Sequence, residues 1–318
     1  MKRYPLKLSY VAKTALWGGK TLNGVWGKQS PYETISETWE LTVREKEMAT
    51  VLCGEAAGMT LQDYFCAVGC DAVSPTYDGS HFPLLIKFID AADTLSVQVH
   101  PDDAYASAVE NDMGKTEMWY VVDCIEDAEL VMGLADGFGK EEFAKAVHEG
   151  KIGDAMRRVK VHPGDCFFIP AGMLHAIGAG ILIAEIQQNS DLTYRVYDFD
   201  RRQADGSLRP LHVDKALNVT RPFTDEEVNA IRFARGKEDE SVLASSRYFT
   251  VQKLEIQNTY EGHVGEDSFL SLLCVEGEGI LTFENEQYTI CRGDSYFLPA
   301  RMGEFSVQGK LCLLTSRV

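Results

Sequence analysis

The amino-acid sequence predicts a mainly β fold with two related β-barrels and a few short inserted helices. Most segments with strand character are short and bounded by Gly or Pro, and they dominate from residue 161 onward. The segment 164–171, Gly-Asp-Cys-Phe-Phe-Ile-Pro-Ala, is echoed at 293–300 as Gly-Asp-Ser-Tyr-Phe-Leu-Pro-Ala. Two copies of a Gly-Asp turn, an apolar strand and a Pro-Ala stop predict two β units of one kind.

The first half of the chain predicts strands at 36–43, 83–89, 94–99 and 117–122. It predicts helices at 59–71, 102–111 and 140–149, and a further short helix at 154–159. Thr60 is a candidate N-cap of the first helix, Pro101 lies near the first turn of the second, and Gly150 follows the third.

The second half predicts short strands at 166–169 and 181–187 and an almost continuous series of strands over 249–318. Segments 212–217 and 224–231 are helical or irregular, and 235–240 is a charged linker. We therefore expect one domain at 1–234, with helical insertions at about 101–160, and a C-terminal β domain at 241–318.

Composition and charge exclude several classes of partner. The 318 residues are 45% hydrophobic and 25% charged, as in ordinary soluble globular proteins. The formal net charge of −17 argues against nucleic acid or an anionic membrane as the main partner, although a local Lys and Arg cluster can still bind a small anion. The chain has no membrane-length apolar run, and its cysteines form no C-x2-C pair. Its first residues are charged without an apolar stretch after them, so we expect no signal peptide and a cytoplasmic protein with reduced thiols.

Two polar side chains share one face of a predicted strand. In the segment Leu95-Ser96-Val97-Gln98-Val99-His100-Pro101, Gln98 and His100 point to one side, while the two valines point to the other. Burying two such groups in an apolar core is unfavourable unless they have partners. A bound metal ion would explain the pattern.

Two further residues extend this pair to a set of four potential ligands. Glu117 begins a predicted strand, and His175 follows the first copy of the repeated unit in the sequence Gly-Met-Leu-His. The second copy continues as Arg-Met-Gly-Glu-Phe and has no His at the matching place. We therefore expect a metal site in the first β unit and none in the second.

These motifs resemble those of a known family. The unit Gly164-x5-Pro170-x-Gly172-x2-His175 resembles the second motif of the cupin superfamily, whose barrel is a double-stranded β-helix. Within that superfamily the chain resembles type I mannose-6-phosphate isomerases of the short bacterial form. The segments that carry the resemblance are Ser96–Asp102, Gly114–Trp119, Ile169–Ala176 and Glu185–Arg195. Four motifs in the same order make the resemblance specific.

The resemblance implies a zinc-dependent aldose–ketose isomerase that interconverts mannose 6-phosphate and fructose 6-phosphate through an enediol. It implies one zinc ion per chain and the following ligands: Gln98, His100, Glu117 and His175. Lys115, Glu185 and Arg195 match positions that line the active site of the family. One departure is visible: longer members often carry a His immediately before the Lys of the Lys-x-Glu motif, where this chain has Gly114.

The chemistry of such a reaction needs these residue types. A metal polarises the sugar carbonyl, and a general base must move a proton between C1 and C2. Glu185 and Lys115 are both candidates for the base, and the sequence does not choose between them. Arg195 suits a phosphate or an enediolate oxygen, because its guanidinium is a planar fork. Lys87 stands in an otherwise apolar strand and needs an anionic partner, so the predicted substrate-binding residues are Lys87, Lys115 and Arg195.

Two other functions share part of this pattern. A non-catalytic, sugar-binding regulatory cupin would bind without turnover, and it has no need of an acid–base carboxylate beside the metal. An iron-dependent cupin oxygenase uses the same two-His, one-carboxylate ligand set. We expect a small phosphorylated sugar as the partner, no nucleic acid or membrane, and a monomer or weak dimer.

Overall fold

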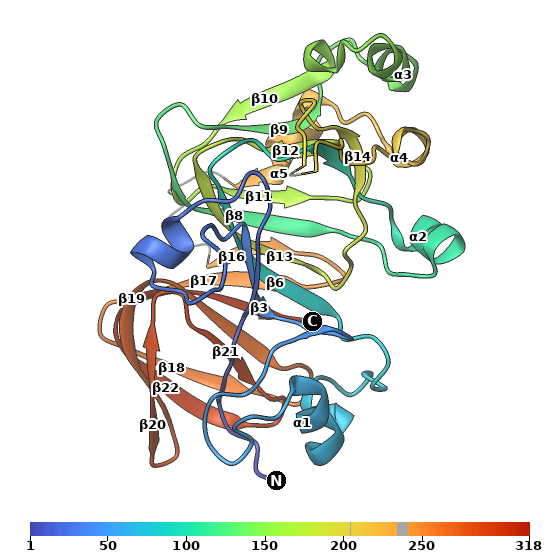
Figure 1. The fold of residues 1–318 in the computed structure, drawn as a ribbon. Coiled ribbons are helices and arrows are strands. Elements are labelled where there is room, and N and C mark those ends of the chain that lie inside the picture. Colours follow the sequence, from blue (N-terminus) through green and yellow to red (C-terminus); the bar gives the residue numbers. More distant parts are fainter. Residues whose placement is uncertain (204, 234–240) are drawn as a thin grey trace.

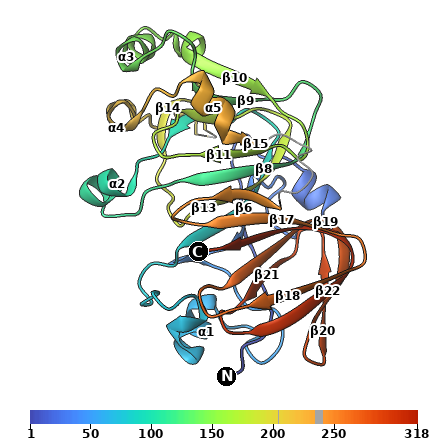
Figure 2. The same ribbon diagram turned by 180° about the vertical axis from the view of Figure 1, so that it is seen from behind.

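The computed structural model describes residues 1–203, 205–233 and 241–318, so the predicted charged linker at 235–240 lies outside the described residues. Its ribbon forms two β-rich halves stacked one on the other (Figure 1), and the view from behind shows the same division (Figure 2). The predicted mainly β fold with short helices is confirmed. The closure of the two halves into barrels stays a prediction.

The half that contains the predicted metal ligands is built on two sheets. The order of the larger sheet is β15-β11-β8-β13-β6-β3-β2, and that of the smaller is β10-β9-β12-β7-β14. The strands of the larger sheet are Arg232–Phe233, Cys166–Ile169, Glu117–Cys124, Ile181–Gln188, Leu84–Ala91, Glu37–Leu41 and Val11–Lys13. Those of the smaller sheet are Met156–Lys160, Glu129–Leu134, His175–Ile177, Val97–Val99 and Tyr194–Tyr197.

The other half is one sheet that contains both ends of the sequence. Its order is β1-β21-β19-β22-β17-β16, with β18 on β22 and β20 on β19. The strands are Leu6–Lys7, Ser295–Leu298, Leu270–Phe283, Gly303–Arg317, Thr250–Ile256 and Val242–Ser245, with Thr259–Val264 and Glu286–Cys291 added at the side. A small hairpin pairs β4 (Val43–Arg44) with β5 (Glu47–Met48). β1 pairs with β21 of this sheet, so the predicted domain boundary between 234 and 241 separates β1 from the strand that it pairs with.

The helices are short, and two of them begin at side-chain caps. They are α1 (Leu61–Val68), α2 (Asp103–Glu110), α3 (Lys140–His148), α4 (Val213–Val219) and α5 (Asp225–Ile231), together with the single turns η1 (Thr21–Val25), η2 (Cys70–Ala72) and η3 (Ile152–Ala155). The Thr60 side chain accepts from the Asp63 backbone N–H, as the sequence predicts, and Asp102 caps α2 in the same way. Gly150 lies in the left-handed region with φ of 70°.

The predicted helix at 154–159 is wrong. Only a single turn forms, at Ile152–Ala155, and the chain then enters β10, which pairs antiparallel with β9. Over 157–160 the exposure alternates along the strand, with Arg157 and Val159 partly buried and Arg158 and Lys160 exposed. Pairing with a strand distant in sequence overrides the local helical preference of these residues.

The repeated sequence unit makes the same turn twice. Gly164 and Gly293 both have positive φ, 92° and 89°. Each donates its backbone N–H to a carbonyl of a neighbouring strand: Gly164 donates to Val121 of β8 at 2.7 Å, and Gly293 donates to Cys274 of β19 at 2.8 Å. Asp165 and Asp294 each accept from the backbone N–H three residues earlier, at 3.0 and 2.9 Å. The two sequence copies are therefore two copies of one local structure.

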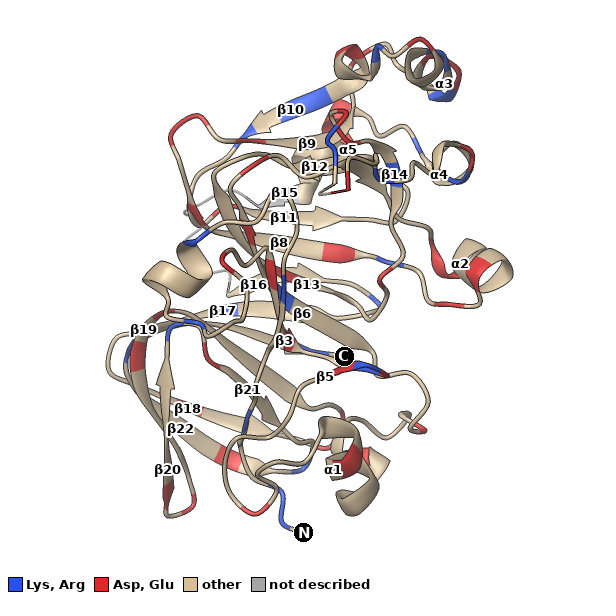
Figure 3. Ribbon diagram, viewed as in Figure 1, with Lys and Arg blue, Asp and Glu red and all other residues tan. Residues whose placement is uncertain are grey.

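One hydrophobic cluster joins the two halves. Phe82, which precedes β6, packs against Phe269, which precedes β19, and against Phe297 of β21, with ring centroids 5.6 and 6.4 Å apart. Acidic residues are spread along the whole ribbon, from α3 at one end to β20 at the other (Figure 3). Among the described residues, no helix is long and apolar enough to cross a membrane.

Candidate metal centre and active site

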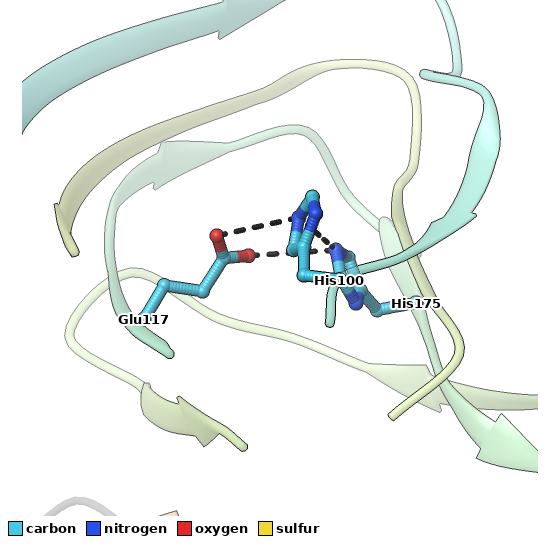
Figure 4. A group of neighbouring side chains, drawn as sticks. All are labelled: His100, Glu117 and His175. Carbon is cyan, nitrogen blue, oxygen red and sulfur yellow. Dashed lines mark hydrogen bonds and ion pairs between the residues drawn. The ribbon is translucent and has the colours of Figure 1, made fainter. Parts of the chain in front are cut away.

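Three buried side chains from both sheets face one another. His100 directly follows β7 and His175 begins β12 in the smaller sheet, while Glu117 begins β8 in the larger one (Figure 4). Their ligand atoms all lie within 4.8 Å of one another, and each residue is at most 1% exposed. The structure therefore brings together three of the four residues that the sequence predicts as metal ligands.

Both histidines present an unprotonated nitrogen to the cluster. His100 Nδ1 lies 2.7 Å from the Leu192 carbonyl, and His175 Nδ1 lies 2.8 Å from the Met173 carbonyl. A carbonyl only accepts, so Nδ1 carries the proton in each ring. Burial lowers the pKa of His175 to about 4. Burial, together with the charge of Lys115 and the proximity of His175, lowers the pKa of His100 well below its usual value. Both rings are neutral, and each Nε2 has a free lone pair.

Glu117 completes a converging set of donors. Its Oε1 lies 3.4 Å from His175 Nε2 and its Oε2 lies 3.6 Å from His100 Nε2, while the two Nε2 atoms are 3.1 Å apart. Burial, reinforced by the charge of Glu185, raises the pKa of Glu117 to about 8. Within the described part of the chain, neither oxygen of Glu117 has a hydrogen-bond partner.

A cation fits this arrangement. Two nitrogen lone pairs 3.1 Å apart repel one another, and a carboxyl group buried without hydrogen bonds is unfavourable. Two imidazole nitrogens and a carboxylate are a ligand set that catalytic zinc and other divalent transition metals accept. The carbonyl bonds to Nδ1 are the usual device that orients a metal-binding His. The donor set of this chain therefore fits a metal ion.

Gln98 is placed beside the cluster. It pairs across the smaller sheet with His175 on one side and Arg195 on the other, so the three residues form one row. Its amide Nε2 lies 3.4 Å from His175 Nε2. Turning the amide by 180° exchanges its oxygen and nitrogen, which brings an acceptor to the same place. Gln98 is thus within reach as a fourth ligand, and that role stays a prediction.

Lys115 is buried next to Glu117, although it follows a Gly and could have been solvent-exposed in a turn. Its Nζ lies 3.6 Å from Glu117 Oε2, and its side chain is 5% exposed. The preceding Gly114 has no space for a side chain, because an added Cβ would lie 2.5 Å from the Asp103 backbone nitrogen. This chain therefore cannot place a His at that position without moving its backbone.

A buried charge network surrounds Glu185. Its Oε2 accepts from Trp119 Nε1 at 2.8 Å, and its Oε1 lies 3.3 Å from Lys87 Nζ. Lys87 also lies 3.4 Å from Glu37. Burial alone would lower the pKa of Lys87, but the charges of Glu37 and Glu185 outweigh it and raise that pKa. The anionic partner that the sequence demands for Lys87 is present within the protein, and contact with a phosphate stays a prediction.

A polar cavity of about 310 Å³ connects these residues. Its lining includes all of the predicted catalytic and substrate-binding residues and one of the predicted ligands: Lys87, Gln98, Lys115, Glu185 and Arg195. The lining also includes residues that the sequence reasoning missed, among them Glu37, Ser96, Asp191, Thr193 and Arg209. Asp191 and Thr193 lie within a recognised motif, so that motif could have indicated them.

Positive charge collects at one side of this cavity. Arg195 Nε donates to Ser96 Oγ at 3.2 Å and its guanidinium also donates to the Pro210 carbonyl at 3.0 Å. Burial, followed by the charge of Arg209, lowers the pKa of Arg195. Asp198 accepts from Arg209 Nε at 2.7 Å. An anionic group of a ligand would be stabilised between the two guanidinium groups.

The chain matches family models and curated relatives of one enzyme family. The family model for the catalytic domain of type I phosphomannose isomerase matches residues 6–144, and that for the cupin domain of mannose-6-phosphate isomerase matches residues 239–318. The chain is 37% identical to mannose-6-phosphate isomerase ManA of Bacillus subtilis, over 97% of each chain. It is 35% identical to the mannose-6-phosphate isomerase of Streptococcus mutans, over 98% of each.

Solved structures give the same result. The crystal structure of the Bacillus subtilis mannose 6-phosphate isomerase matches with a TM-score of 0.87 and 36% identity over 99% of each chain. A phosphomannose isomerase variant from Salmonella typhimurium matches with a TM-score of 0.79 at 18% identity, which shows a shared fold alone. The resemblance seen in the sequence is confirmed, and the chain belongs to the type I phosphomannose isomerase family.

Proposed function

We propose that this protein is a zinc-dependent isomerase that interconverts mannose 6-phosphate and fructose 6-phosphate by proton transfer between C1 and C2 through an enediol. One observation carries the proposal: the donor atoms of His100, Glu117 and His175 converge beside a polar cavity that Lys115 and Glu185 line. Membership of the type I phosphomannose isomerase family supports the choice of reaction.

The metal would be held by His100, Glu117 and His175, with Gln98 as the fourth ligand. When bound, a zinc ion polarises the sugar carbonyl and stabilises negative charge that develops on its oxygen. The described residues of 241–318 contain no second cluster of this kind. The proposal includes a division into a catalytic unit at 1–234 and a metal-free unit at 241–318, with one zinc per chain.

Glu185 is the better placed of the two candidate bases. A base needs an available lone pair, and Glu185 Oε1, which lies 3.3 Å from Lys87 Nζ, has no hydrogen-bond partner among the described residues. Trp119 Nε1 donates to the other oxygen of Glu185 at 2.8 Å and so fixes the orientation of this carboxylate, which lines the cavity. Lys115 would neutralise negative charge on the sugar oxygens nearest Glu117.

The phosphate would lie at the side of the cavity that Arg195 and Arg209 line. Arg195 is oriented by Ser96, and the guanidinium groups are planar forks that suit a phosphate. With the phosphate held there, the chain of the sugar would extend toward Gln98 and Lys115. Lys87 would contribute positive charge from the wall.

Nuclear magnetic resonance of mannose 6-phosphate in D2O with the purified, zinc-loaded chain tests the proposal. We expect fructose 6-phosphate to form and part of it to carry deuterium at C1, because a proton held by Glu185 or Lys115 exchanges with solvent. Absence of conversion by a folded, zinc-loaded chain would refute the isomerase and favour a sugar-binding cupin. Deuterium at C1 would support the enediol route, because a direct hydride shift would carry the original C2 hydrogen to C1. Metal analysis that finds iron, with oxygen uptake, would favour an oxygenase.

A further inference from the structure

The Asp103 carboxylate, in the first turn of α2, connects both halves of the molecule to the active-site segment. Its Oδ1 accepts from the Gly114 backbone N–H at 3.0 Å and from Gln188 Nε2 at 2.9 Å. Its Oδ2 accepts from the Tyr248 hydroxyl at 2.7 Å and from Arg247 at 3.2 Å. Arg247 and Tyr248 lie between β16 and β17 of the C-terminal sheet.

The segment that Asp103 holds carries two residues of the proposed site. Gly114 is followed by Lys115, Thr116 and Glu117. The Thr116 backbone N–H donates to Gln188 Oε1 at 2.9 Å, and the Gln188 backbone N–H donates to the Thr116 carbonyl at 3.0 Å. The Gln188 side chain therefore bridges Asp103 and Thr116, so Asp103 acts on this segment both directly and through Gln188.

Packing at Gly114 makes the position of the segment sensitive to Asp103. A Cβ at Gly114 would lie 2.5 Å from the Asp103 backbone nitrogen and 2.6 Å from the Asp102 carbonyl carbon. The segment thus lies directly on the start of α2, and a shift of α2 is transmitted to it. The same contact leaves no compressible gap that could absorb such a shift.

Tyr248 provides the main contact from the C-terminal half. Its ring is partly buried against the shared hydrophobic cluster, whereas the Arg247 side chain is 73% exposed, where an ion pair contributes little. Burial would raise the pKa of Asp103, but the bonds from Tyr248, Gln188 and Gly114 outweigh it and lower that pKa. Asp103 is therefore ionised at neutral pH, and its hydrogen bonds are charge-assisted.

We propose that Asp103 and Tyr248 are positioning residues for the segment 114–117, so that the C-terminal half sets the placement of Lys115 and Glu117. This inference rests on the proposed function, in which Lys115 neutralises negative charge on the sugar oxygens and Glu117 is a metal ligand. It gives the C-terminal half, which has no metal cluster among its described residues, a part in the chemistry of the other half.

The test compares Tyr248→Phe with Tyr288→Phe in the full chain. Tyr288 is a matched control, since its hydroxyl donates to Glu286 at 2.7 Å in the same half and it lines a different cavity. We expect Tyr248→Phe to weaken zinc binding, measured by chelator competition, roughly 10-fold, and to lower kcat by a similar factor. The KM for mannose 6-phosphate should change by less than about twofold, because the Arg195 side of the cavity is unaltered. The control should match the wild type.

A Tyr248→Phe variant with the zinc affinity and kcat of the control would overturn the inference. If that variant has a lowered unfolding temperature, Asp103→Asn takes its place. It should lose zinc affinity in the same direction while Tyr248 keeps its packing, and an unchanged affinity there would also refute the inference. A wild-type chain that binds zinc without isomerising the sugar overturns the proposed function alone, because the zinc affinities still decide the positioning role.

Discussion

The two histidines of the cluster are oriented by backbone carbonyls, not by side chains. Leu192 and Met173 contribute only their carbonyl oxygens to His100 and His175. The tautomer of each ring therefore depends on the backbone positions of Leu192, before β14, and Met173, before β12, and not on their side chains. The fold itself keeps both Nε2 atoms available to a metal.

Zinc binding should depend on pH through Glu117. The raised pKa of about 8 means that the metal-free carboxyl carries a proton at pH 7, which zinc must displace. The apparent zinc affinity should therefore rise about tenfold per pH unit up to pH ~8 and then level off. Chelator competition at several pH values measures it. A constant affinity between pH 6 and 8 would contradict the raised pKa of Glu117.

Replacing Glu185 by Gln should separate catalysis from metal binding. The change keeps the size of the side chain and removes the lone pair that accepts the proton, so kcat should fall roughly 10²- to 10⁴-fold. The variant should still bind one zinc, because Glu185 is not a proposed ligand. Glu33→Gln is the control, as Glu33 is exposed and paired with Lys20. A kcat within about threefold of the wild type would assign the base to Lys115.

At the scale of elements, strands that carry motifs could be predicted from the sequence and strand partners could not. Alternation in the segment before Pro101 placed Gln98 and His100 on one face, and the structure has them beside the same cluster. The helix expected at 154–159 is a strand because β9 pairs with it. Pairing between distant strands leaves little trace in a local pattern.

A buried ion pair joins β3 to the turn before β21. Lys28 Nζ lies 2.7 Å from Glu40 Oε1 and donates to the Gly293 carbonyl at 2.9 Å. Glu40→Leu would leave the ammonium buried without its counter-charge, so the free energy of unfolding should fall by about 3 kcal/mol. Lys20→Gln, which breaks the exposed pair with Glu33, should change it by less than about 0.5 kcal/mol. Urea unfolding compares the two, and equal effects would contradict a structural role for the buried pair.

At the scale of the whole molecule, four motifs in order were enough to predict the family, the mainly β fold and the three residues that cluster as candidate metal ligands. The contribution of Arg209 and the Asp103–Tyr248 contact could not be predicted, because loops distant in sequence meet only in the folded chain. The shared cluster around Phe82, Phe269 and Phe297 explains why they meet, since it holds the two halves in a fixed relation.

The most direct test of the central claim is a coupled assay of mannose 6-phosphate isomerisation by one preparation of the chain in three states. The preparation is assayed as purified, after complete removal of metal by a chelator, and after zinc is restored to one ion per chain. We predict that turnover is lost on chelation and returns with zinc. Full activity in the metal-free state, or no turnover by a folded chain that holds one zinc, would contradict the account.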